Sequence, residues 1–300
     1  MISKSTYMIF PIIAAFLAGI SYNVVEILIN TYNVNEIEIL IFGNLIAGLF
    51  ILPFVKNKIQ FKQFFNNRKN LILLIVASLT TFALAYLAIY SAIGMIGSSK
   101  SSFIISIEPL FIAALAFIFL KEKLSKKDIA GAALMIFGAL IINFDFTHFK
   151  FIFGLGELLA ILAPLLFAIG IVITTNLLKR LNILGLTSFE LIFGSLSILI
   201  FGLITRFNFK VSVLIFALLI LISILVTFNW LTYNKGLKYI GASLTSILYS
   251  SKAFFTLLIS LIFVWLIPNS GIKIPKNLIT MIMGGLILVL GLIIIKKGKK

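Results

Sequence analysis

Ten apolar segments of 18–25 residues follow one another along the chain, separated by short polar loops. Each segment is long enough to cross a hydrocarbon core about 30 Å thick as an α-helix. Helices satisfy their own backbone polar groups, as any structure inside a bilayer must. The sequence therefore predicts an all-α integral membrane protein with ten transmembrane helices, at residues 7–29, 37–55, 70–90, 98–120, 127–144, 154–178, 184–205, 212–233, 241–264 and 277–295.

The composition argues against a soluble protein and against a nucleic-acid partner. Hydrophobic residues make up 61% of the chain and charged residues 11%, whereas soluble domains contain about 25% charged residues. The net charge of +16 comes mostly from short loops, which carry 18 Lys and Arg residues on one predicted side and 5 on the other. The positive-inside rule then predicts a multi-pass protein of the cytoplasmic (inner) membrane with both termini in the cytoplasm.

Motifs for enzymatic or metal chemistry are missing from the sequence. The chain has no cysteine, and its one histidine, His148, falls in a predicted external loop. No HExxH, carboxylate cluster or Walker motif is present. We therefore expect no cofactor, no metal and no enzymatic activity. The first apolar run is too long for a signal peptide and is expected to remain as a span.

Short sequence matches indicate that the chain is duplicated. IFGNL at 41–45 is echoed by IFGSL at 192–196, and Tyr90 followed by Gly97 is echoed by Tyr233 followed by Gly241. The offset of about five spans predicts two five-helix repeats, at residues 1–150 and 151–300. Because each repeat has an odd number of spans, the second should be inverted in the membrane, a plan that places binding sites near the midplane.

Two opposite charges occupy matching positions in the fourth and ninth spans. Glu108 and Lys252 each lie eleven residues after the glycine that opens the span. An ionisable group at this depth is costly and is functional by default. The pair could bind a zwitterionic substrate, with the ammonium on Glu108 and the carboxylate on Lys252, or Glu108 could carry a coupling proton. The alternative is a static buried ion pair, which adds little net stability.

Polar and aromatic residues extend this candidate site. Thr245, Tyr249, Lys252, Thr256 and Ser260 share one face of the ninth span, and Ser101 lies on the corresponding face of the fourth. We interpret this face as cavity lining, with close helix packing as the alternative. Tyr86 on the third span and Trp230 on the eighth are further aromatic candidates, whereas Tyr90 and Tyr233 lie near predicted span ends and could belong to an interfacial belt.

The remaining candidates concern gating and packing. Glu26 and Lys100 lie at similar depth and could form an outer gate, although both could instead reach water. Pro109 would loosen the helix beside Glu108. Glu157 and Glu190 lie near span ends and are expected to reach an interface. Glycines in the fifth and tenth spans predict close packing within a monomer or, alternatively, a homodimer: Gly131, Gly138, Gly284, Gly285 and Gly291.

The segment IEPLFIAALAFIFLKEKLSKKDIAGAALMIFGALII resembles the EamA family of the drug/metabolite transporter superfamily, with Pro109, Glu122, Gly131 and Gly138 at the family's positions. This resemblance covers essentially the whole chain as two five-span repeats. It implies a secondary transporter for a small organic metabolite, surrounded by membrane lipids. It also implies a central cavity lined partly by the third and eighth spans, where Tyr86 and Trp230 would form aromatic walls. A Glu directly before this Pro, as Glu108 is here, resembles the branch of the family that includes amino-acid and metabolite exporters.

Other functions are less well supported by the same residues. Some family members import metabolites such as S-adenosylmethionine, so uptake or exchange is the main alternative to export. A membrane-embedded lipid enzyme would need His, Asp or Glu clustered at one interface, which the sequence does not have. A channel would favour rings of like charge rather than a single Glu–Lys pair.

Overall fold

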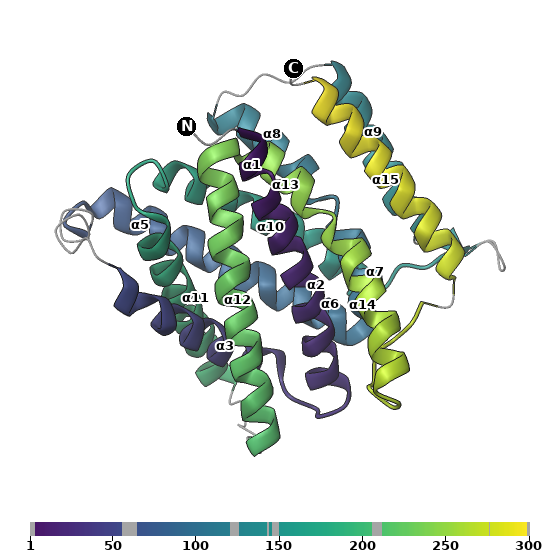
Figure 1. The fold of residues 1–300 in the computed structure, drawn as a ribbon, viewed down its shortest axis with the longest axis horizontal. Coiled ribbons are helices and arrows are strands. Elements are labelled where there is room, and N and C mark those ends of the chain that lie inside the picture. Colours follow the sequence, from purple (N-terminus) through teal and green to yellow (C-terminus); the bar gives the residue numbers. More distant parts are fainter. Residues whose placement is uncertain are drawn as a thin grey trace.

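A computed structural model describes residues 4–55, 65–120, 126–142, 144–145, 150–205, 212–275 and 277–298 as a helical bundle with one two-residue β-ladder (Figure 1). Within these residues, eight helical stretches are long and apolar enough to cross a membrane, and α9 and α15 contain shorter apolar stretches. The elements are α1 (Lys4–Tyr7), α2 (Ile9–Asn30), α3 (Glu36–Ile51), η1 (Leu52–Phe54), α5 (Arg68–Ser78), η2 (Leu79–Ala85), α6 (Tyr86–Ile96), α7 (Ser98–Ile105), α8 (Glu108–Leu120), α9 (Lys126–Ile142), β1 (Phe144–Asp145), β2 (Lys150–Phe151), α10 (Leu155–Leu177), α11 (Ile183–Thr205), α12 (Val213–Ile240), α13 (Ala242–Tyr249), α14 (Lys252–Leu266) and α15 (Leu278–Gly298).

The surface is apolar, unlike that of a soluble protein, and the mainly hydrophobic interior also contains many polar side chains. Large hydrophobic side chains such as Trp265 (80% exposed) and Ile204 (75% exposed) point outward. Many Ser, Thr and Asn side chains are buried, and Ser78, Thr227 and others donate to the carbonyl four residues earlier. Hydrocarbon tails are as apolar as leucine, so this distribution suits a bundle whose outer face contacts lipid.

Helices α6 and α12 extend beyond the predicted spans. The third apolar segment continues through the π-helical turn η2 to Ile96, and the eighth continues to Ile240. Tyr233 therefore lies seven residues before the end of α12, well inside the helix. The end of an apolar run marks where a helix leaves the hydrocarbon, but the helix can continue past that point into water or loop contacts.

The fourth and ninth apolar segments are each broken into two half-helices. The first break separates α7 from α8 at Ser106 and Ile107, and the second separates α13 from α14 at Ser250 and Ser251. The two breaks touch, because the Ser106 hydroxyl donates to the Ser250 carbonyl oxygen at 3.2 Å. The sequence predicted a loosened helix beside Pro109 in the fourth span but no break in the ninth.

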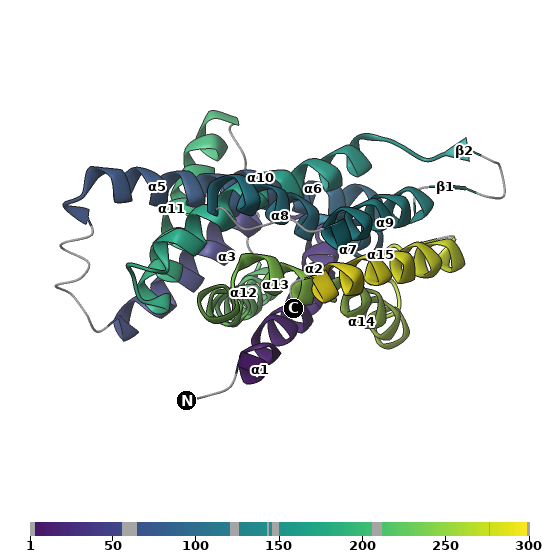
Figure 2. The ribbon, with the colours of Figure 1, turned by 90° about the horizontal axis from the view of Figure 1, so that it is seen from above.

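Helices α9 and α15 form a closely packed pair at one edge of the bundle (Figures 1 and 2). Glycines allow this approach: a Cβ on Gly284 would lie 2.6 Å from the Gly138 carbonyl oxygen, and one on Gly291 would lie 2.5 Å from the Gly131 carbonyl oxygen. The predicted glycine positions therefore pack against each other within one chain.

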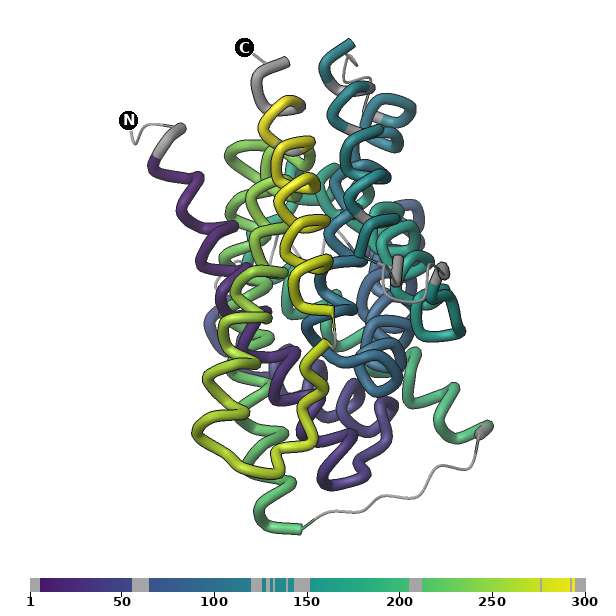
Figure 3. Tube along the Cα trace, turned by 90° about the vertical axis from the view of Figure 1, so that its right-hand side faces the viewer, coloured from purple at the N-terminus to yellow at the C-terminus, as the bar shows by residue number. Residues whose placement is uncertain are grey.

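The beginning of α2 and the end of α15 lie at the same end of the bundle, which we call the terminal side (Figure 3). The opposite end is called the far side. Since successive spans alternate in direction, Gly97 lies on the far side, where α6 ends and α7 begins. Gly241 lies on the terminal side, where α12 ends and α13 begins.

Candidate functional site

The centre of the bundle contains a buried ion pair between the two matched charges. Lys252 Nζ donates to Glu108 Oε2 at 2.7 Å, and the two side chains are 1% and 3% exposed. Glu108 is the first residue of α8, and Lys252 is the first residue of α14. Each charge is therefore positioned by a helix break.

The helix breaks also supply polarity to the site. The first turn of a helix has backbone N–H groups without intrahelical partners, and its last turn has free carbonyl groups. Glu108 and Lys252 both begin a half-helix and both follow the end of another, so each break places a positive helix start and a negative helix end beside its charge. Pro109 follows the first break, but Ala253 follows the second, so proline is not required for a break at this position.

Aromatic side chains surround the ion pair. The Tyr233 hydroxyl donates to Glu108 Oε1 at 3.4 Å, and Lys252 Nζ lies 4.2 Å from the centre of the Tyr249 ring. Trp230 packs against Tyr233, with ring centres 5.4 Å apart, and against Tyr86 at 6.2 Å. All four rings are buried. Such rings can contact both the charged and the apolar parts of an organic ligand.

Tyr233 and its counterpart Tyr90 correct the expectation of an interfacial belt. Tyr233 is 1% exposed and Tyr90 is 2% exposed. The position of Tyr233, which matches Tyr90 in the other repeat, is the sequence signal that could have identified it. Tyr22 and Asn229, which were not predicted, also belong to this region, and Asn229 Nδ2 lies 3.5 Å from the Tyr249 hydroxyl.

A small cavity lies among the buried tyrosines of this region. A cavity of about 10 Å³ remains between α2, α6 and α12, lined by Ala18, Ser21, Tyr22, Tyr86, Tyr90, Val226 and Asn229. This volume accommodates about one water molecule. This cavity is too small for an organic ligand, and Glu108 and Lys252 are themselves buried, so a ligand could reach them only after neighbouring groups move.

The predicted polar face of the ninth span divides into two parts. On its far side, Ser260 donates to Asn23 Oδ1 at 2.6 Å, and Asn23 Nδ2 donates to the Thr256 carbonyl oxygen at 3.0 Å. These bonds join α14 to α2, which is the packing role considered as the alternative. Thr245 of α13, on the terminal side, and its counterpart Ser101 of α7, on the far side, are buried, and their hydroxyls have no hydrogen-bond partner among the described residues.

The predicted gate residues Glu26 and Lys100 have different partners. Lys100 Nζ forms an ion pair with Glu157 Oε1 at 2.5 Å. Glu26 is fully buried and accepts from the backbone N–H groups of Ser98, at 2.8 Å, and Lys273, at 2.7 Å. Glu26 thereby joins the start of α7 to the segment before α15, on the far side. The expectation that Glu26 would contact Lys100 or reach water is wrong.

The corresponding glycines show that the two sides differ. Gly97 and Gly241 have nearly the same backbone conformation, with φ of +84° and +83°. A Cβ at Gly97 would lie 3.0 Å from Lys273 and 3.2 Å from Glu26 Oε1. A Cβ at Gly241 would have no neighbour within 4 Å in the part of the chain that the structure describes. Among the described residues, the turn at Gly97 is therefore covered and the turn at Gly241 is not.

The other predicted acid, Glu190, does not reach an interface. Its side chain is fully buried on α11, and Thr174 Oγ1 of α10 donates to Glu190 Oε1 at 2.5 Å. Glu122 and His148 lie outside the described residues. Among the described residues, no cluster of three or more His, Asp or Glu side chains could hold a metal ion.

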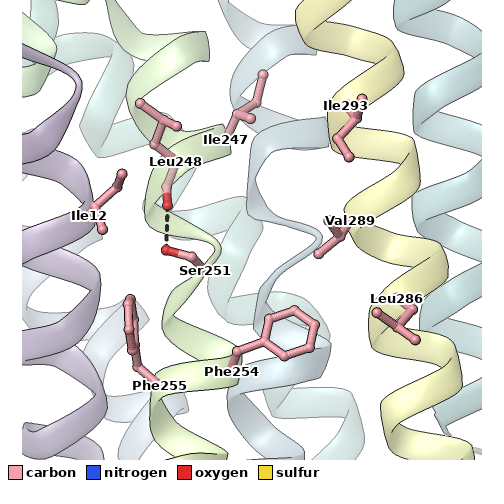
Figure 4. A pocket seen from close by; sticks show the side chains of 9 residues that line it. All are labelled: Ile12, Ile247, Leu248, Ser251, Phe254, Phe255, Leu286, Val289 and Ile293. Atoms are coloured by element: carbon pink, nitrogen blue, oxygen red, sulfur yellow. Dashed lines mark hydrogen bonds between the residues drawn. The ribbon is translucent and has the colours of Figure 1, made fainter. Parts of the chain in front are cut away.

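Two larger hollows face outward and contain mostly apolar side chains. One, of about 390 Å³, lies between α2, α13, α14 and α15, and Figure 4 shows Ile12, Phe254, Leu286 and their neighbours around it. Ser251, at the second helix break, points into this groove and donates to the Leu248 carbonyl oxygen at 2.7 Å. The other, of about 560 Å³, lies between α5, α8 and α10. Neither hollow is lined by Glu108 or Lys252.

Comparisons with known proteins match nearly the whole chain. The model of the EamA-like transporter family matches residues 5–144 and 154–295. An uncharacterized transporter of Methanothermobacter thermautotrophicus is 24% identical over 81% of this chain and 75% of its own length. The uncharacterized transporter YyaM of Bacillus subtilis is 25% identical over 54% of this chain and 55% of its own length. A solved structure titled "Crystal structure of protein" has the same fold, with a TM-score of 0.66, 15% identity and coverage of 97% of this chain and 96% of that chain.

Proposed function

This chain belongs to the EamA-like transporter family of the drug/metabolite transporter superfamily, and we propose that it is a secondary transporter that moves an amino acid or related zwitterion by alternating access. As a member of this family the chain is a multi-pass membrane transporter and not an enzyme. Its partners are a small-molecule substrate and membrane lipids. Export across the cytoplasmic membrane is the direction that we propose.

The observation that carries this proposal is the buried ion pair at the two helix breaks. A zwitterion could replace each half of the pair, with its ammonium on Glu108 and its carboxylate on Lys252. Tyr233 and Tyr249 would then contact the bound molecule, because both already contact the charged groups. The protein's own ion pair would close the empty site and avoid leaving either charge buried alone.

The architecture that we propose is ten transmembrane helices arranged as two inverted five-helix repeats, covering residues 1–150 and 151–300. The matching breaks before Glu108 and Lys252 support it, as do the matching conformations of Gly97 and Gly241. The pairing of Gly131 with Gly291 and of Gly138 with Gly284 also follows the pattern of a two-fold axis between α9 and α15. Discontinuous helices at a repeat interface are typical of transporter binding sites.

Counterflow in proteoliposomes tests the proposed function. Vesicles loaded with unlabelled L-amino acids should transiently accumulate external radiolabelled L-amino acids well above the level in protein-free vesicles, and the uptake should saturate. Individual amino acids then define the substrate, and an S-adenosylmethionine-like zwitterion tests the uptake or exchange alternative. Equilibration without counterflow would indicate a channel and would contradict the proposal.

The proposed topology places both termini in the cytoplasm, and the absence of cysteine makes this easy to test. We expect a single cysteine at Val213, which is 90% exposed at the far-side start of α12, to react with a membrane-impermeant thiol reagent in intact cells. Lys238→Cys, at the other end of α12, should react only after permeabilisation. The opposite pattern would reverse the assigned orientation.

A further inference from the structure

Glu190 is a buried carboxyl group that the proposed substrate site does not use. It lies on α11 and is 0% exposed. The Thr174 hydroxyl of α10 donates a hydrogen bond to its Oε1 atom, and the Asn234 side chain of α12 is another polar neighbour. Its Oε2 atom has no hydrogen-bond partner among the described residues, and the same holds for Asn234 Oδ1.

No cation compensates this carboxyl group within the described part of the chain. The Lys252–Glu108 and Lys100–Glu157 ion pairs do not include Glu190, and the hydrogen bond to its Oε1 atom comes from the neutral hydroxyl of Thr174. A buried carboxylate without a cation is so unfavourable that the group takes up a proton instead. The geometry therefore fits the neutral acid, whose added hydrogen can be donated to a neighbouring acceptor.

The charged groups on neighbouring elements have other positions or partners. Arg68 and Lys69, which begin α5, are exposed. Arg180, in the turn before α11, donates to Asn70 Oδ1 at 2.7 Å. Lys235 of α12 lies 4.0 Å from the centre of the Phe10 ring. The other acidic residues on elements packed against α11 are Glu36 and Glu38, in the first turn of α3 on the far side.

Helix α12 lies between α11 and the central ion pair. Asn234 contacts α11 at Thr187, three residues before Glu190, where its Nδ2 atom donates to Oγ1 at 2.8 Å. The residue before Asn234, Tyr233, donates to Glu108. A ligand that takes the place of the ion pair must change the Tyr233 contact, and the same movement of α12 would alter the surroundings of Glu190.

We propose that Glu190 is the proton site of this transporter and that it couples export of the substrate to entry of a proton. This inference rests on the proposed transport function. Substrate binding would shift α12 and open Glu190, which then releases its proton to water on the terminal side. Glu190 lies seven residues into α11, about 10 Å from the terminal end of that helix. Because the coupling is reciprocal, protonation in turn favours the closed ion pair and substrate release.

The test compares wild type with Glu190→Gln, in which a neutral amide replaces the neutral acid. Radiolabelled L-amino acids serve as the probe in proteoliposomes with an acidic interior. Wild type should accumulate label several-fold more than vesicles without a pH gradient. Glu190→Gln should keep counterflow within about twofold and lose the gain from the gradient. Glu36→Gln, which removes a half-buried carboxyl group near the far end of α3, is the matched control and should behave as wild type.

Infrared spectroscopy tests the proton site separately from transport. At neutral pH the wild-type spectrum should contain the C=O stretch of a protonated carboxyl group, and this band should be missing from Glu190→Gln but present in Glu36→Gln. A band unchanged in Glu190→Gln would overturn the proposal, as would a gradient response equal to wild type. If wild type shows no amino-acid counterflow, the proposed substrate fails, and the infrared band still decides whether Glu190 holds a proton.

Discussion

Lys252→Ala should abolish amino-acid counterflow and lower the free energy of unfolding by about 3–5 kcal/mol. The substitution leaves Glu108, which is 2% exposed, buried without its cation. The remaining contact, from the Tyr233 hydroxyl at 3.4 Å, is too long to compensate for the 2.7 Å bond from Lys252. Counterflow and thermal unfolding in detergent are the two measurements.

A double variant separates the functional role of the pair from a structural role. Glu108→Gln combined with Lys252→Met removes both charges while keeping similar volumes. Replacing a buried ion pair in this way is often neutral or stabilising, so the double variant should unfold near the wild-type temperature but should not transport. Transport by the double variant, or by Lys252→Ala alone, would show that the pair is only a structural contact.

Gly284→Leu should prevent α15 from packing against α9 and destabilise the protein by about 3 kcal/mol. Even a Cβ atom at this position would lie 2.6 Å from the Gly138 carbonyl oxygen and 2.7 Å from an atom of Ile142. Backbone atoms form part of this contact, so the neighbouring helix must move as a whole. Thermal unfolding and size-exclusion profiles in detergent measure the effect.

Met283→Leu is the matched control for this glycine. It lies one residue away on the same helix but is 53% exposed on the outer surface. It should therefore leave stability within about 0.5 kcal/mol of wild type. Gly284→Leu with wild-type stability would mean that α9 and α15 do not pack through these glycines. The glycine face would then be free for a homodimer contact.

The positions of most helices could be predicted from sequence because hydrocarbon enforces a simple pattern of long apolar runs. The predicted span 154–178 corresponds to α10 at Leu155–Leu177, and 184–205 corresponds to α11 at Ile183–Thr205. The ends of α6 and α12 were missed because a helix does not have to stop where its sequence becomes less apolar. The pairing of Glu108 with Lys252 followed from their matched positions in the two repeats.

Other features depend on tertiary contacts that no local pattern reveals. The break before Lys252 occurs without a proline, and one contact there is the Ser106–Ser250 hydrogen bond between the two repeats. Glu190 lies only seven residues into its helix, and its burial depends on neighbours from α10 and α12. Glu26 accepts hydrogen bonds from the backbone N–H groups of two distant segments. Almost every residue has such an N–H group, so residue types in the sequence do not reveal this contact.

The unequal surroundings of Gly97 and Gly241 have a consequence for the working cycle. If the repeats are structural equivalents, the conformation of each repeat in this structure is the one that the other repeat would adopt in the opposite-facing state. Reversing the cycle would expose the turn at Gly97 and cover the turn at Gly241. Exchanging the conformations of the two repeats would then convert this structure into the opposite-facing state.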